Sequence, residues 1–403
     1  MALHSLEGRL RLTGNALFVA TLCSIMLLML PVLGLFLPQE DMLANEKRKI
    51  APFPPCASLG DWVSFPKSFE AYFADRFAYR QQLMRTHHRL LIKLFGRSPL
   101  HKVLISEDGW LFFQELQGNA IDLYHRNIKP FSEKEMQVIH EEMTRRQQWV
   151  ESWGGKAIFM LVPSKETIYP EHLPSIFQRQ ANPMSRYDQW AEIVTNDPSL
   201  SHIDLRNALR VGKSQGLIYF RGDSHWNFDG AYIGYRELVN ALRQWYPGTS
   251  LVARSEKAGP KTFQGDLARM LDVGDWFDEI DNAADSSPQN GTTTKCAKLA
   301  PSISGGLPIP EKCEPTVYEC NNTNLPTAVL IRDSMANRWR PWLPDNFRRI
   351  VLMSNWRPAA EVVERERPDV VIFETVERSL EQYLSVHLVF DPIAKNNRFT
   401  WER

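Results

Sequence analysis

The feature of this sequence that most restricts its fold is an alternation of short apolar runs and helical patterns between residues 157 and 373. Unbroken apolar runs suit strands that are covered on both faces, as in a parallel sheet. The alternation therefore predicts an α/β fold in which helices flank a largely parallel sheet. The predicted strands are residues 157–162, 217–220, 327–331, 349–353 and 369–373, and the predicted helices include 229–246 and 359–366.

The chain before residue 157 predicts helices and one hairpin. Aromatic residues at 69, 72, 73 and 77 recur at helical spacing. The stretch "VLISEDGWLFF" (103–113) holds two apolar runs around an Asp108-Gly109 turn, which is a hairpin signal. Ser132 and Glu135 form a capping box that opens a further helix. Later, residues 280–312 are rich in Ser, Thr, Asn, Gly and Pro and predict a long surface loop.

Residues 16–37 carry no charge. At 1.5 Å per residue, a helix of this length spans a hydrocarbon core of ~30 Å. A signal-peptide core is usually shorter and ends in a small-residue cleavage site, whereas "PQEDML" follows here. The segment thus predicts an uncleaved transmembrane anchor, with a cleaved signal peptide as the alternative. Basic residues stand on both sides of it, so flanking charge does not decide its orientation.

The predicted organisation has five parts. The chain of 403 residues is long enough for one large domain with its own core. The parts are a short N-terminal tail (1–15), the anchor (16–37), a Pro-rich linker (38–60), the folded domain (61–390) and a C-terminal tail (391–403).

Charge and composition exclude one class of function. The 47 basic and 47 acidic residues balance, and no basic block is interleaved with aromatic residues. The electrostatic signature of a nucleic-acid binder is therefore missing. The 12 tryptophans suit stacking on sugar rings, but a large α/β core explains them equally well. No Cys-x-x-Cys motif or His-Cys cluster is present, so we expect neither a metal nor a cofactor.

Four of the five cysteines lie outside the predicted anchor, which holds Cys23. Cys56, Cys296, Cys313 and Cys320 permit three pairings, and in an oxidising compartment they would form two disulfides. We favour Cys313 with Cys320, which closes a short loop and leaves Cys56 for Cys296. The alternative is a set of free thiols in a reducing cytosol.

Two serines, Ser224 and Ser334, follow predicted strands. Ser224 lies in a Gly-Asp-Ser triplet within "RGDSHWN", where one class of serine esterases carries its nucleophile. That class needs an Asp-x-x-His near its C-terminus to activate the serine. The only histidine after His225 is His387, and no carboxylate comes shortly before it. Ser224 is therefore the weaker candidate.

The same stretch also contains an Asp-x-His motif, Asp223 and His225. On an extended backbone these two side chains point to the same side. Asp223 would then accept a hydrogen bond from one imidazole nitrogen, fix the tautomer and leave the other nitrogen as a base. The alternative is an ordinary turn with a capping aspartate. A metal site is less favoured, because no third ligand is grouped with the pair.

Ser334 supplies the missing nucleophile. It follows the strand 327–331 and a sharp turn at Arg332-Asp333, and it opens a predicted helix. Its oxygen would project from the carboxyl edge of the sheet, and its backbone N–H would serve as an oxyanion donor. Serine and aspartate are also common helix caps, and we expect Asp333 to be such a capping or turn residue. Together with Asp223 and His225, Ser334 predicts a Ser-His-Asp triad.

With these motifs the chain resembles the AlgJ/AlgX-like polysaccharide (alginate-type) O-acetyltransferases. Their SGNH hydrolase-like domain is circularly rearranged, so that Asp-x-His-Trp precedes the serine. The matching stretches occur in the family's order and span roughly residues 60 to 385. They are "FPKSFEAYFADRFAYR", "VLISEDGWLFF", "VPSKETIYPEHLP", "YFRGDSHWNFDGAYIGY", "VLIRDS" and "RPDVVIFETVERSL".

The resemblance assigns roles to particular residues. The family's catalytic Asp and His correspond to Asp223 and His225, and its nucleophile to Ser334. Arg332 stands where a Gly-Asp-Ser box carries glycine, and for Arg378 a surface ion pair is the alternative to substrate contact. The candidate substrate-binding residues are Trp226, Asn227, Arg332 and Arg378. Lys165 and Tyr169 follow a predicted strand and either line the cleft or are a solvated lysine and a core tyrosine.

The resemblance implies an O-acetyltransferase that moves an acetyl group, through an acetyl-serine intermediate, to hydroxyls of a cell-envelope or exported polysaccharide. It further implies a single-pass protein of the cell inner membrane with a periplasmic catalytic domain, and a membrane-bound acyltransferase partner that supplies acetyl groups. Two alternatives stay open. One is a carbohydrate acetyl esterase with the same triad, and the other is a non-catalytic glycan-binding or scaffold protein of the envelope, which Arg332 keeps in play.

Overall fold

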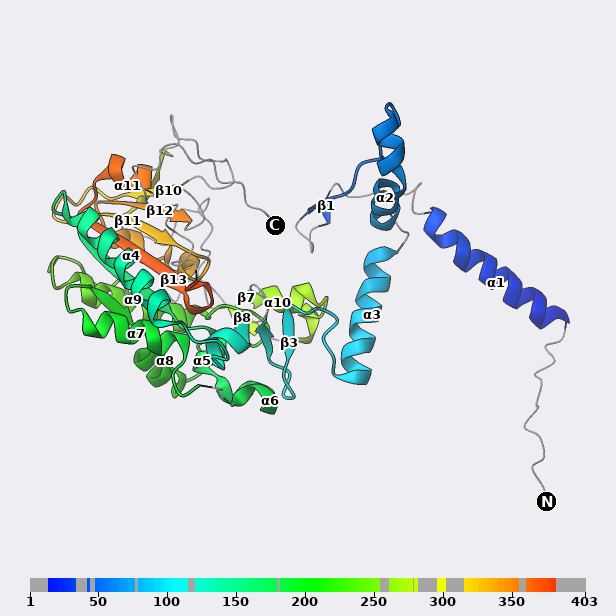
Figure 1. Ribbon diagram of the computed structural model, residues 1–403, viewed down its shortest axis with the longest axis horizontal. Coiled ribbons are helices and arrows are strands. Elements are labelled where there is room, and N and C mark those ends of the chain that lie inside the picture. Colours follow the sequence, from blue (N-terminus) through cyan, green and yellow to red (C-terminus); the bar gives the residue numbers. More distant parts are fainter. Residues whose placement is uncertain are drawn as a thin grey trace, which may run out of the picture. The chain divides into compact units, whose positions relative to one another are not determined.

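The computed structural model divides the chain into two compact units (Figure 1). The first is Met1–Phe95 with Met270–Asp272, and the second is Gly96–Arg269 with Val273–Arg403. The sequence analysis began the folded domain at residue 61, whereas residues 61–95 belong to the first unit. The structure describes residues 14–33, 42–43, 48–76, 79–114, 120–179, 182–253, 261–277, 279–281, 296–301, 315–354 and 360–381.

The first unit is mainly helical. Its elements are α1 (Gly14–Leu33), β1 (Met42–Leu43), β2 (Arg48–Lys49), α2 (Leu59–Asp75) and α3 (Arg80–Phe95). Helix α2 contains Phe69, Tyr72 and Phe73, so the predicted helix is confirmed for these three residues, and Phe77 lies outside the described residues. It begins at a capping box in which Ser58 accepts a hydrogen bond from the Asp61 backbone and the Asp61 carboxylate accepts one from the Ser58 backbone.

Helix α1 covers most of the predicted anchor, and residues 34–37 lie outside the described residues. Among the helices that the structure describes, none combines the length and the apolar character needed to cross a membrane. The transmembrane anchor expected over residues 16–37 is therefore not shown.

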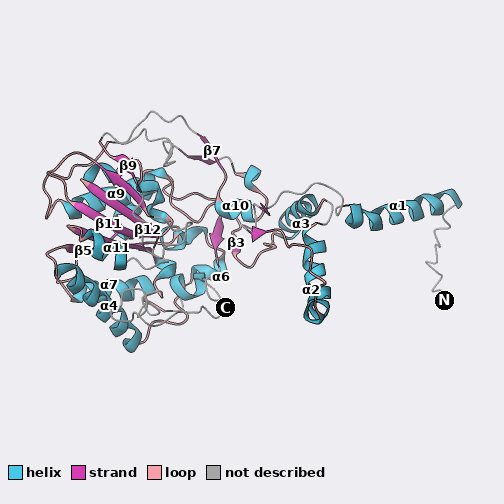
Figure 2. Ribbon diagram, turned by 90° about the horizontal axis from the view of Figure 1, so that it is seen from above, coloured by secondary structure: helices cyan, strands magenta, loops and turns pink. Residues whose placement is uncertain are grey.

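The second unit is built on a seven-stranded mixed sheet with the order β6-β5-β13-β11-β12-β10-β9. Its first five strands are parallel, and β10 and β9 add an antiparallel edge next to β12. Figure 2 shows strands β5, β11, β12 and β9 of this sheet among the helices. The strands are β5 (Lys156–Val162), β6 (His202–Asp204), β9 (Lys298–Ala300), β10 (Thr316–Glu319), β11 (Thr327–Arg332), β12 (Arg349–Ser354) and β13 (Val370–Val376).

Both faces of this sheet are buried, as the unbroken apolar runs predicted. Alternate residues of β5 enter two separate hydrophobic cores, with Ile158 and Met160 in one and Phe159 and Leu161 in the other. The first core includes residues of α8 (Arg206–Lys213) and α9 (Phe228–Leu242). The second includes residues of α4 (Glu133–Glu151), α7 (Arg186–Asn196) and α11 (Ala360–Glu366). The unit is thus a three-layer α/β/α structure.

The remaining helices begin where the sequence provides caps. Helix α4 (Glu133–Glu151) starts at the predicted Ser132–Glu135 capping box, and α7 (Arg186–Asn196) starts at a second one, Ser185–Asp188. The shorter helices are η2 (Ile121–His125), α5 (Lys165–Ile168), η3 (Pro170–His172), α6 (Ser175–Gln178), α10 (Asp266–Met270), η4 (Gly274–Trp276), η6 (Met335–Trp339), η7 (Leu343–Asn346), α11 (Ala360–Glu366) and η8 (Glu377–Ser379).

Two small antiparallel hairpins accompany the sheet. The predicted hairpin at 103–113 is confirmed as β3 (Val103–Ile105) paired with β4 (Leu111–Phe113). Its turn contains Gly109 at φ 82°, a backbone conformation that residues with a side chain rarely adopt. The second hairpin pairs β7 (Lys261–Phe263) with β8 (Glu279–Asp281). We refer to residues 261–281 as the β7–β8 segment.

Two predictions about secondary structure, one strand and one loop, were wrong. Residues 217–220 do not join the sheet; they form a tight hairpin with residues 225–227. Ile218 and Tyr219 of this run pack into the first core, and the Tyr219 hydroxyl donates to the carbonyl of Pro163 just after β5. Residues 280–312 are not loop throughout, since they include part of β8 and all of β9.

The cysteine pairing also differs from the prediction. Cys296 is bonded to Cys320, whereas Cys56 is a free thiol and Cys313 lies outside the described residues. The antiparallel register explains this pairing. Lys298 of β9 lies opposite Glu319 of β10, and Cys296, just before Lys298, and Cys320, just after Glu319, lie beyond this pair at the same end of the ladder. Their Cα atoms are 5.2 Å apart, within the range of disulfides.

Candidate active site

The hairpin formed by residues 218–227 carries the Asp-x-His motif at its tip. Asn227 N–H donates to the Ile218 carbonyl at 3.0 Å, and Phe220 N–H donates to the His225 carbonyl at 3.3 Å. Tyr219 and Trp226 pair between these two bonds. Residues 221–224 therefore form the turn, and Asp223 and His225 lie at its end.

Asp223 holds His225 through both its backbone and its ring. Asp223 Oδ1 accepts the His225 backbone N–H at 2.8 Å and lies 2.6 Å from His225 Nδ1. The Asp223 side chain is almost wholly buried. Burial opposes its ionisation, but the hydrogen bonds and the charge of His225 outweigh this and hold the pKa of Asp223 well below its usual range. The ionised carboxylate thus fixes the tautomer that carries a hydrogen on Nδ1.

The second nitrogen of His225 meets Ser334. His225 Nε2 and Ser334 Oγ are 2.7 Å apart, so the hydroxyl donates to the unprotonated nitrogen. The structure thus brings together the three residues that the sequence predicted as a triad. Their order Ser-His-Asp and their distances match the arrangement in which a histidine activates a serine hydroxyl.

Ser334 lies just past the carboxyl end of the parallel strand β11 and caps the short 3₁₀ helix η6. Asp333, before it, is a capping and turn residue as predicted, because its two oxygens accept the N–H groups of Met335 at 2.8 Å and Val376 at 2.6 Å. Asp333 N–H donates in turn to Glu374. Burial and the nearby Asp333 raise the pKa of Glu374 well above its usual range. The turn is therefore tied to β13, while Ser334 itself is exposed.

Ser224 faces away from the reacting hydroxyl. Its Oγ donates to Asp266 Oδ2 at 2.7 Å, and its backbone N–H donates to Asp266 Oδ1 at 2.8 Å. Ser224 Oγ lies 3.3 Å from His225 Nδ1, the nitrogen that Asp223 already holds. Its side chain is buried. Ser224 is consequently a structural partner of Asp266, as its weaker candidacy from the sequence implied.

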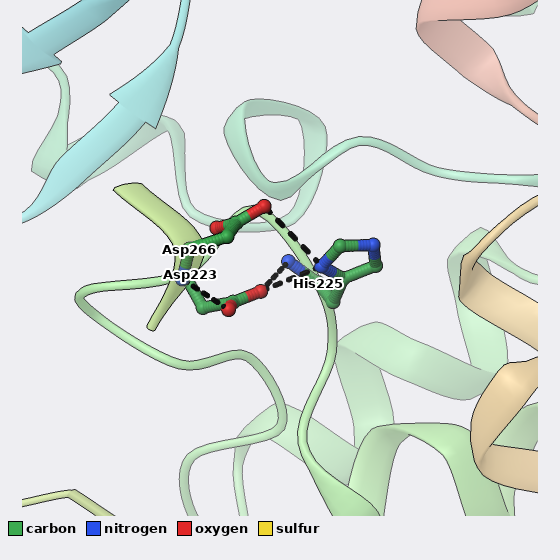
Figure 3. A group of neighbouring side chains, drawn as sticks. All are labelled: Asp223, His225 and Asp266. Carbon is green, nitrogen blue, oxygen red and sulfur yellow. Dashed lines mark hydrogen bonds and ion pairs between the residues drawn. The ribbon is translucent and has the colours of Figure 1, made fainter. Parts of the chain in front are cut away.

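Asp266 is a site residue that the sequence analysis missed. Its backbone N–H donates to Asp223 Oδ2 at 2.6 Å, and its Oδ2 lies 3.7 Å from His225 Nδ1. Figure 3 shows the carboxylates of Asp223 and Asp266 on the Nδ1 side of the imidazole ring. The expectation that no third candidate ligand joins Asp223 and His225 was wrong, since ligand atoms of these three residues lie within 4.8 Å of one another. The carboxylate of Asp223 accepts the His225 backbone N–H, and that of Asp266 accepts the N–H and hydroxyl of Ser224. These hydrogen bonds suit a catalytic triad better than a metal site.

Two predicted substrate contacts have structural roles instead. The side chain of Trp226 is wholly buried, and its Nε1–H donates to the Met335 carbonyl at 3.0 Å. Asn227 caps α9, because its Oδ1 accepts the N–H groups of Asp229 and Gly230 and its Nδ2 donates to Leu217. Trp226 therefore joins the histidine hairpin to the serine turn, and Asn227 ends the hairpin.

The two arginine candidates also face protein. Arg332 Nη1 donates to the Asp333 carbonyl at 2.9 Å, and burial together with the charge of Arg340 lowers its pKa. The guanidinium of Arg378 lies 5.6 Å from the ring centroid of Phe113 in a cation–π contact. Neither contact involves Asp223, His225 or Ser334. The role of these arginines in substrate binding stays a prediction.

Lys165 and Tyr169 are both core residues. Tyr169 is buried and its hydroxyl accepts the Ile218 N–H at 3.1 Å, so the core-tyrosine alternative is confirmed. Lys165 is 2% exposed, which excludes a solvated lysine. Its position directly after the buried strand β5 was the signal for a buried location, but the sequence does not reveal its partners, which are carbonyls of the histidine hairpin.

Comparison with known proteins identifies the family. The family model described as the SGNH hydrolase-like domain of the acetyltransferase AlgX matches residues 103–307, more than half of the chain. The chain belongs to this family. The mixed sheet between helix layers is accordingly an SGNH hydrolase-like α/β fold.

Curated relatives of this AlgX-family chain carry the name probable alginate O-acetylase AlgJ. The chain is 25% identical over 256 residues to a protein named probable alginate O-acetylase AlgJ from Pseudomonas aeruginosa, covering 59% of this chain and 57% of that protein. It is 22% identical over 327 residues to the protein of the same name from Pseudomonas putida, covering 78% and 79%. The chain thus spans little more than half of the first of these relatives.

Two solved structures are similar to this AlgX-family chain. The O-acetyltransferase domain of Pseudomonas putida AlgJ is 18% identical with a TM-score of 0.46, covering 72% of this chain and 95% of that domain. AlgX of Pseudomonas aeruginosa is 11% identical with a TM-score of 0.44, covering 70% and 67%.

Proposed function

We propose that this protein is an O-acetyltransferase that moves an acetyl group, through an acetyl-Ser334 intermediate, to hydroxyls of a cell-envelope or exported polysaccharide. The observation that carries the proposal is the continuous hydrogen-bonded chain from the buried Asp223 carboxylate through His225 to the exposed Ser334 hydroxyl. Membership of the AlgX acetyltransferase family supports the reaction type. The order of the chain, with Asp223 and His225 before Ser334, agrees with a circularly rearranged SGNH-like domain.

In the first half-reaction, His225 Nε2 takes the hydroxyl proton of Ser334 as Oγ attacks the carbonyl carbon of the acetyl donor. The tetrahedral intermediate collapses, and the donor's leaving oxygen receives that proton from His225. The product is an ester between the acetyl group and Ser334 Oγ. Asp223 stays ionised and stabilises the imidazolium that forms in between.

In the second half-reaction, a sugar hydroxyl replaces the leaving group. His225 Nε2 removes its proton, the sugar oxygen attacks the acetyl carbon, and Ser334 Oγ leaves with the proton that His225 returns. Negative charge develops on the acetyl oxygen in both steps. The backbone N–H of Ser334 is our candidate oxyanion donor, since the N–H of the next residue, Met335, is already bonded to Asp333.

The names of the relatives support the nature of the acceptor. Proteins named alginate O-acetylase are similar to this chain, which supports a polysaccharide acceptor of the alginate type. We further propose a membrane-bound acyltransferase as the partner that supplies acetyl groups. The competing acceptor is water, which would make the protein a carbohydrate acetyl esterase with an unchanged triad.

We propose that the protein is held in the cell inner membrane by one helix, with the second unit in the periplasm. The uncharged sequence at residues 16–37 supports the anchor, and the Cys296–Cys320 disulfide supports an oxidising compartment. A reporter enzyme that is active only outside the cytoplasm, fused after Arg403, should be active. Activity of a cytoplasm-specific reporter at the same position would contradict both parts of this proposal.

The function is tested by incubating the protein with a small acetyl ester, with and without acetyl-free alginate oligosaccharides. Mass spectrometry should detect an added acetyl group on the peptide that contains Ser334 and then on the oligosaccharide. Acetyl release as free acetate, unchanged by the oligosaccharide, would support the esterase instead. The absence of any acetyl-enzyme with any ester would favour a non-catalytic protein.

A further inference from the structure

The loop of residues 220–224, which leads into His225, is held on one side by the buried Lys165 and on the other by the half-buried Asp266 and Glu279. Its carbonyl oxygens face Lys165, which follows strand β5, and its amide N–H groups face carboxylates of the β7–β8 segment. Loops usually satisfy their polar groups with water. Here the protein supplies partners for both kinds of group, which gives the loop a defined shape.

Lys165 holds the carbonyl side. Its Nζ lies 3.0 Å from the carbonyl oxygen of Phe220, 3.1 Å from that of Arg221 and 2.6 Å from that of Asp223. An ammonium group has three N–H donors and no acceptor, so the three carbonyls use all its hydrogens. The rings of Trp110 and Phe112, with centroids 5.7 and 5.1 Å from Nζ, also lie near the ammonium.

Two carboxylates hold the amide side. Glu279 accepts the N–H groups of Arg221 and Gly222, the latter at 2.9 Å, and Asp266 accepts the Ser224 N–H at 2.8 Å. The Asp266 backbone N–H completes the set by donating to the Asp223 carboxylate. The segment before His225 is thus bonded along its length, and its geometry depends on one buried ammonium group and two half-buried carboxylates.

We propose that Lys165 is a positioning residue of the active site, whose positively charged form keeps Asp223 and His225 aligned with Ser334 by gathering three carbonyls of the loop. Lys165 does not touch the reacting atoms; it acts through the carbonyl of Asp223. The inference rests on the proposed function, because alignment with Ser334 has a consequence only if Ser334 is the nucleophile.

The charged form is needed for a geometric reason. A neutral amine has two N–H donors and one lone pair, so one of the three carbonyls would lose its donor and face a lone pair instead. The carboxylates that favour the charged form are Asp223, Asp266, Glu279 and Glu166. Burial nevertheless prevails and lowers the pKa of Lys165 to about 8. The loop should therefore loosen as the pH rises above about 8.

The test compares Lys165→Met with Lys213→Met in the full chain. Methionine keeps the length of the side chain and removes the charge and the donors. Lys213 is a matched control, because its Nζ also donates to a carbonyl, that of Ile168 at 2.7 Å, and lies over an aromatic ring, that of Tyr169. The contacts that the structure describes for Lys213, with Ile168, Glu171 and Tyr169, all lie outside residues 220–224. Hydrolysis of 4-nitrophenyl acetate is followed from pH 6 to 10, with Ser334→Ala subtracted as background.

We expect the wild-type rate to fall with a midpoint near pH 8 and Lys213→Met to keep this fall. Lys165→Met should lower kcat by about 10- to 100-fold, with little change in KM, and its profile should lack the fall near pH 8. A wild-type alkaline profile in Lys165→Met would overturn the proposal. So would the loss of that profile in Lys213→Met, because the effect would then not be specific to Lys165.

A second readout does not depend on activity. Hydrogen exchange of the peptide covering residues 217–227, corrected for the intrinsic effect of pH, should show protection in the wild type that is lost between pH 7 and 9.5. Unchanged protection over that range would overturn the proposal even if Lys165→Met does not fold. If Ser334→Ala keeps full esterase activity, the proposed function fails, and exchange still decides whether Lys165 holds the loop.

Discussion

His225 Nε2 and Ser334 Oγ lie 2.7 Å apart although 109 residues separate them in the sequence. A second bond links the next residue on each side, since Trp226 Nε1–H donates to the Met335 carbonyl. The histidine hairpin and the serine turn are therefore joined at two successive positions. Because the Trp226 bond is buried, it keeps the exposed pair in register without itself taking part in the reaction.

Changing Ser334 to Ala should remove the nucleophile, abolish acetyl-enzyme formation and lower esterase activity by about 10³-fold or more. Ser224→Ala should cost far less, because Ser224 Oγ bonds to Asp266 and lies away from Ser334. Rates with a small acetyl ester and intact-protein mass spectrometry measure both effects. An inactive Ser224→Ala beside an active Ser334→Ala would reverse the assignment of the nucleophile.

His225→Ala should match Ser334→Ala in its loss of activity, because members of one catalytic unit fail together and their effects do not add. The double variant should accordingly be no worse than either single variant. Asp223→Asn should also be severe, since an amide in place of the carboxylate favours the wrong imidazole tautomer. Circular dichroism must first show that each variant is folded. Losses that multiply in the double variant would argue against a shared mechanism.

Gly265→Ala should disturb the catalytic loop without touching a catalytic side chain. A Cβ at Gly265 would lie 2.1 Å from the Gly222 carbonyl oxygen and 2.8 Å from the Asp223 nitrogen, so the backbone must shift. We expect activity to fall about 10²-fold and stability by roughly 1–3 kcal/mol. Gly248→Ala is the control, because its nearest neighbouring atom is 3.9 Å away. Equal effects of the two substitutions would contradict the steric explanation.

Glu377→Gln should make the protein more stable at alkaline pH. Glu377 is wholly buried, and burial raises its pKa to about 8, so the folded state keeps a proton that the unfolded state loses above about pH 4.5. This contribution to stability is present below pH 4.5 and is lost as the pH rises towards 8. Urea unfolding at pH 5 to 8 should show a gain of roughly 1–3 kcal/mol for the variant at pH 8.

The control for Glu377→Gln is Glu141→Gln, an exposed carboxylate on α4. It should leave the pH dependence of stability as in the wild type. A urea midpoint of Glu377→Gln equal to that of the wild type at every pH would contradict the prediction. It would mean that the Glu377 carboxylate is ionised in the folded protein.

Replacing Cys296 and Cys320 together by Ala should lower the free energy of unfolding by roughly 3 kcal/mol, because the disulfide closes a loop across 24 positions of sequence. Thermal unfolding with and without a reductant measures this. Cys56→Ala should change stability by no more than about 0.5 kcal/mol, since Cys56 is exposed and unpaired. A reductant that leaves the melting temperature of the wild type unchanged would contradict the prediction.

The sequence predicted the central strands well for a physical reason. Strands β5, β11, β12 and β13 are covered on both faces, and this burial requires continuous apolar runs that are visible without a structure. Strand β6 was missed because it has three residues of which only the middle one is buried. Residues 217–220 were wrongly predicted as a strand of the sheet, since a short apolar run has the same composition whether it joins a sheet or packs into a core as part of a separate hairpin.

The same distinction applies to the site. Asp223, His225 and Ser334 were predictable because strand ends and an Asp-x-His spacing are local features. The roles of Trp226 and Asn227 were not, because a tryptophan suits both sugar stacking and a buried core, and an asparagine suits both a ligand contact and a helix cap. Asp266 gave no local signal at all, since its contacts with Ser224 and Asp223 arise only when the β7–β8 segment folds back.

The position of β13 has a consequence for biosynthesis. Strand β13 is the last strand along the described chain, yet it lies inside the sheet between β5 and β11. Strand β13 pairs with β5 on one side and with β11 on the other, so these two strands are joined only through β13. The ribosome must therefore release the chain up to at least residue 376 before the sheet can form. Folding of the second unit is thus held back until β13 has left the ribosome, and a chain truncated before β13 should be recognised by cellular proteases as unfolded.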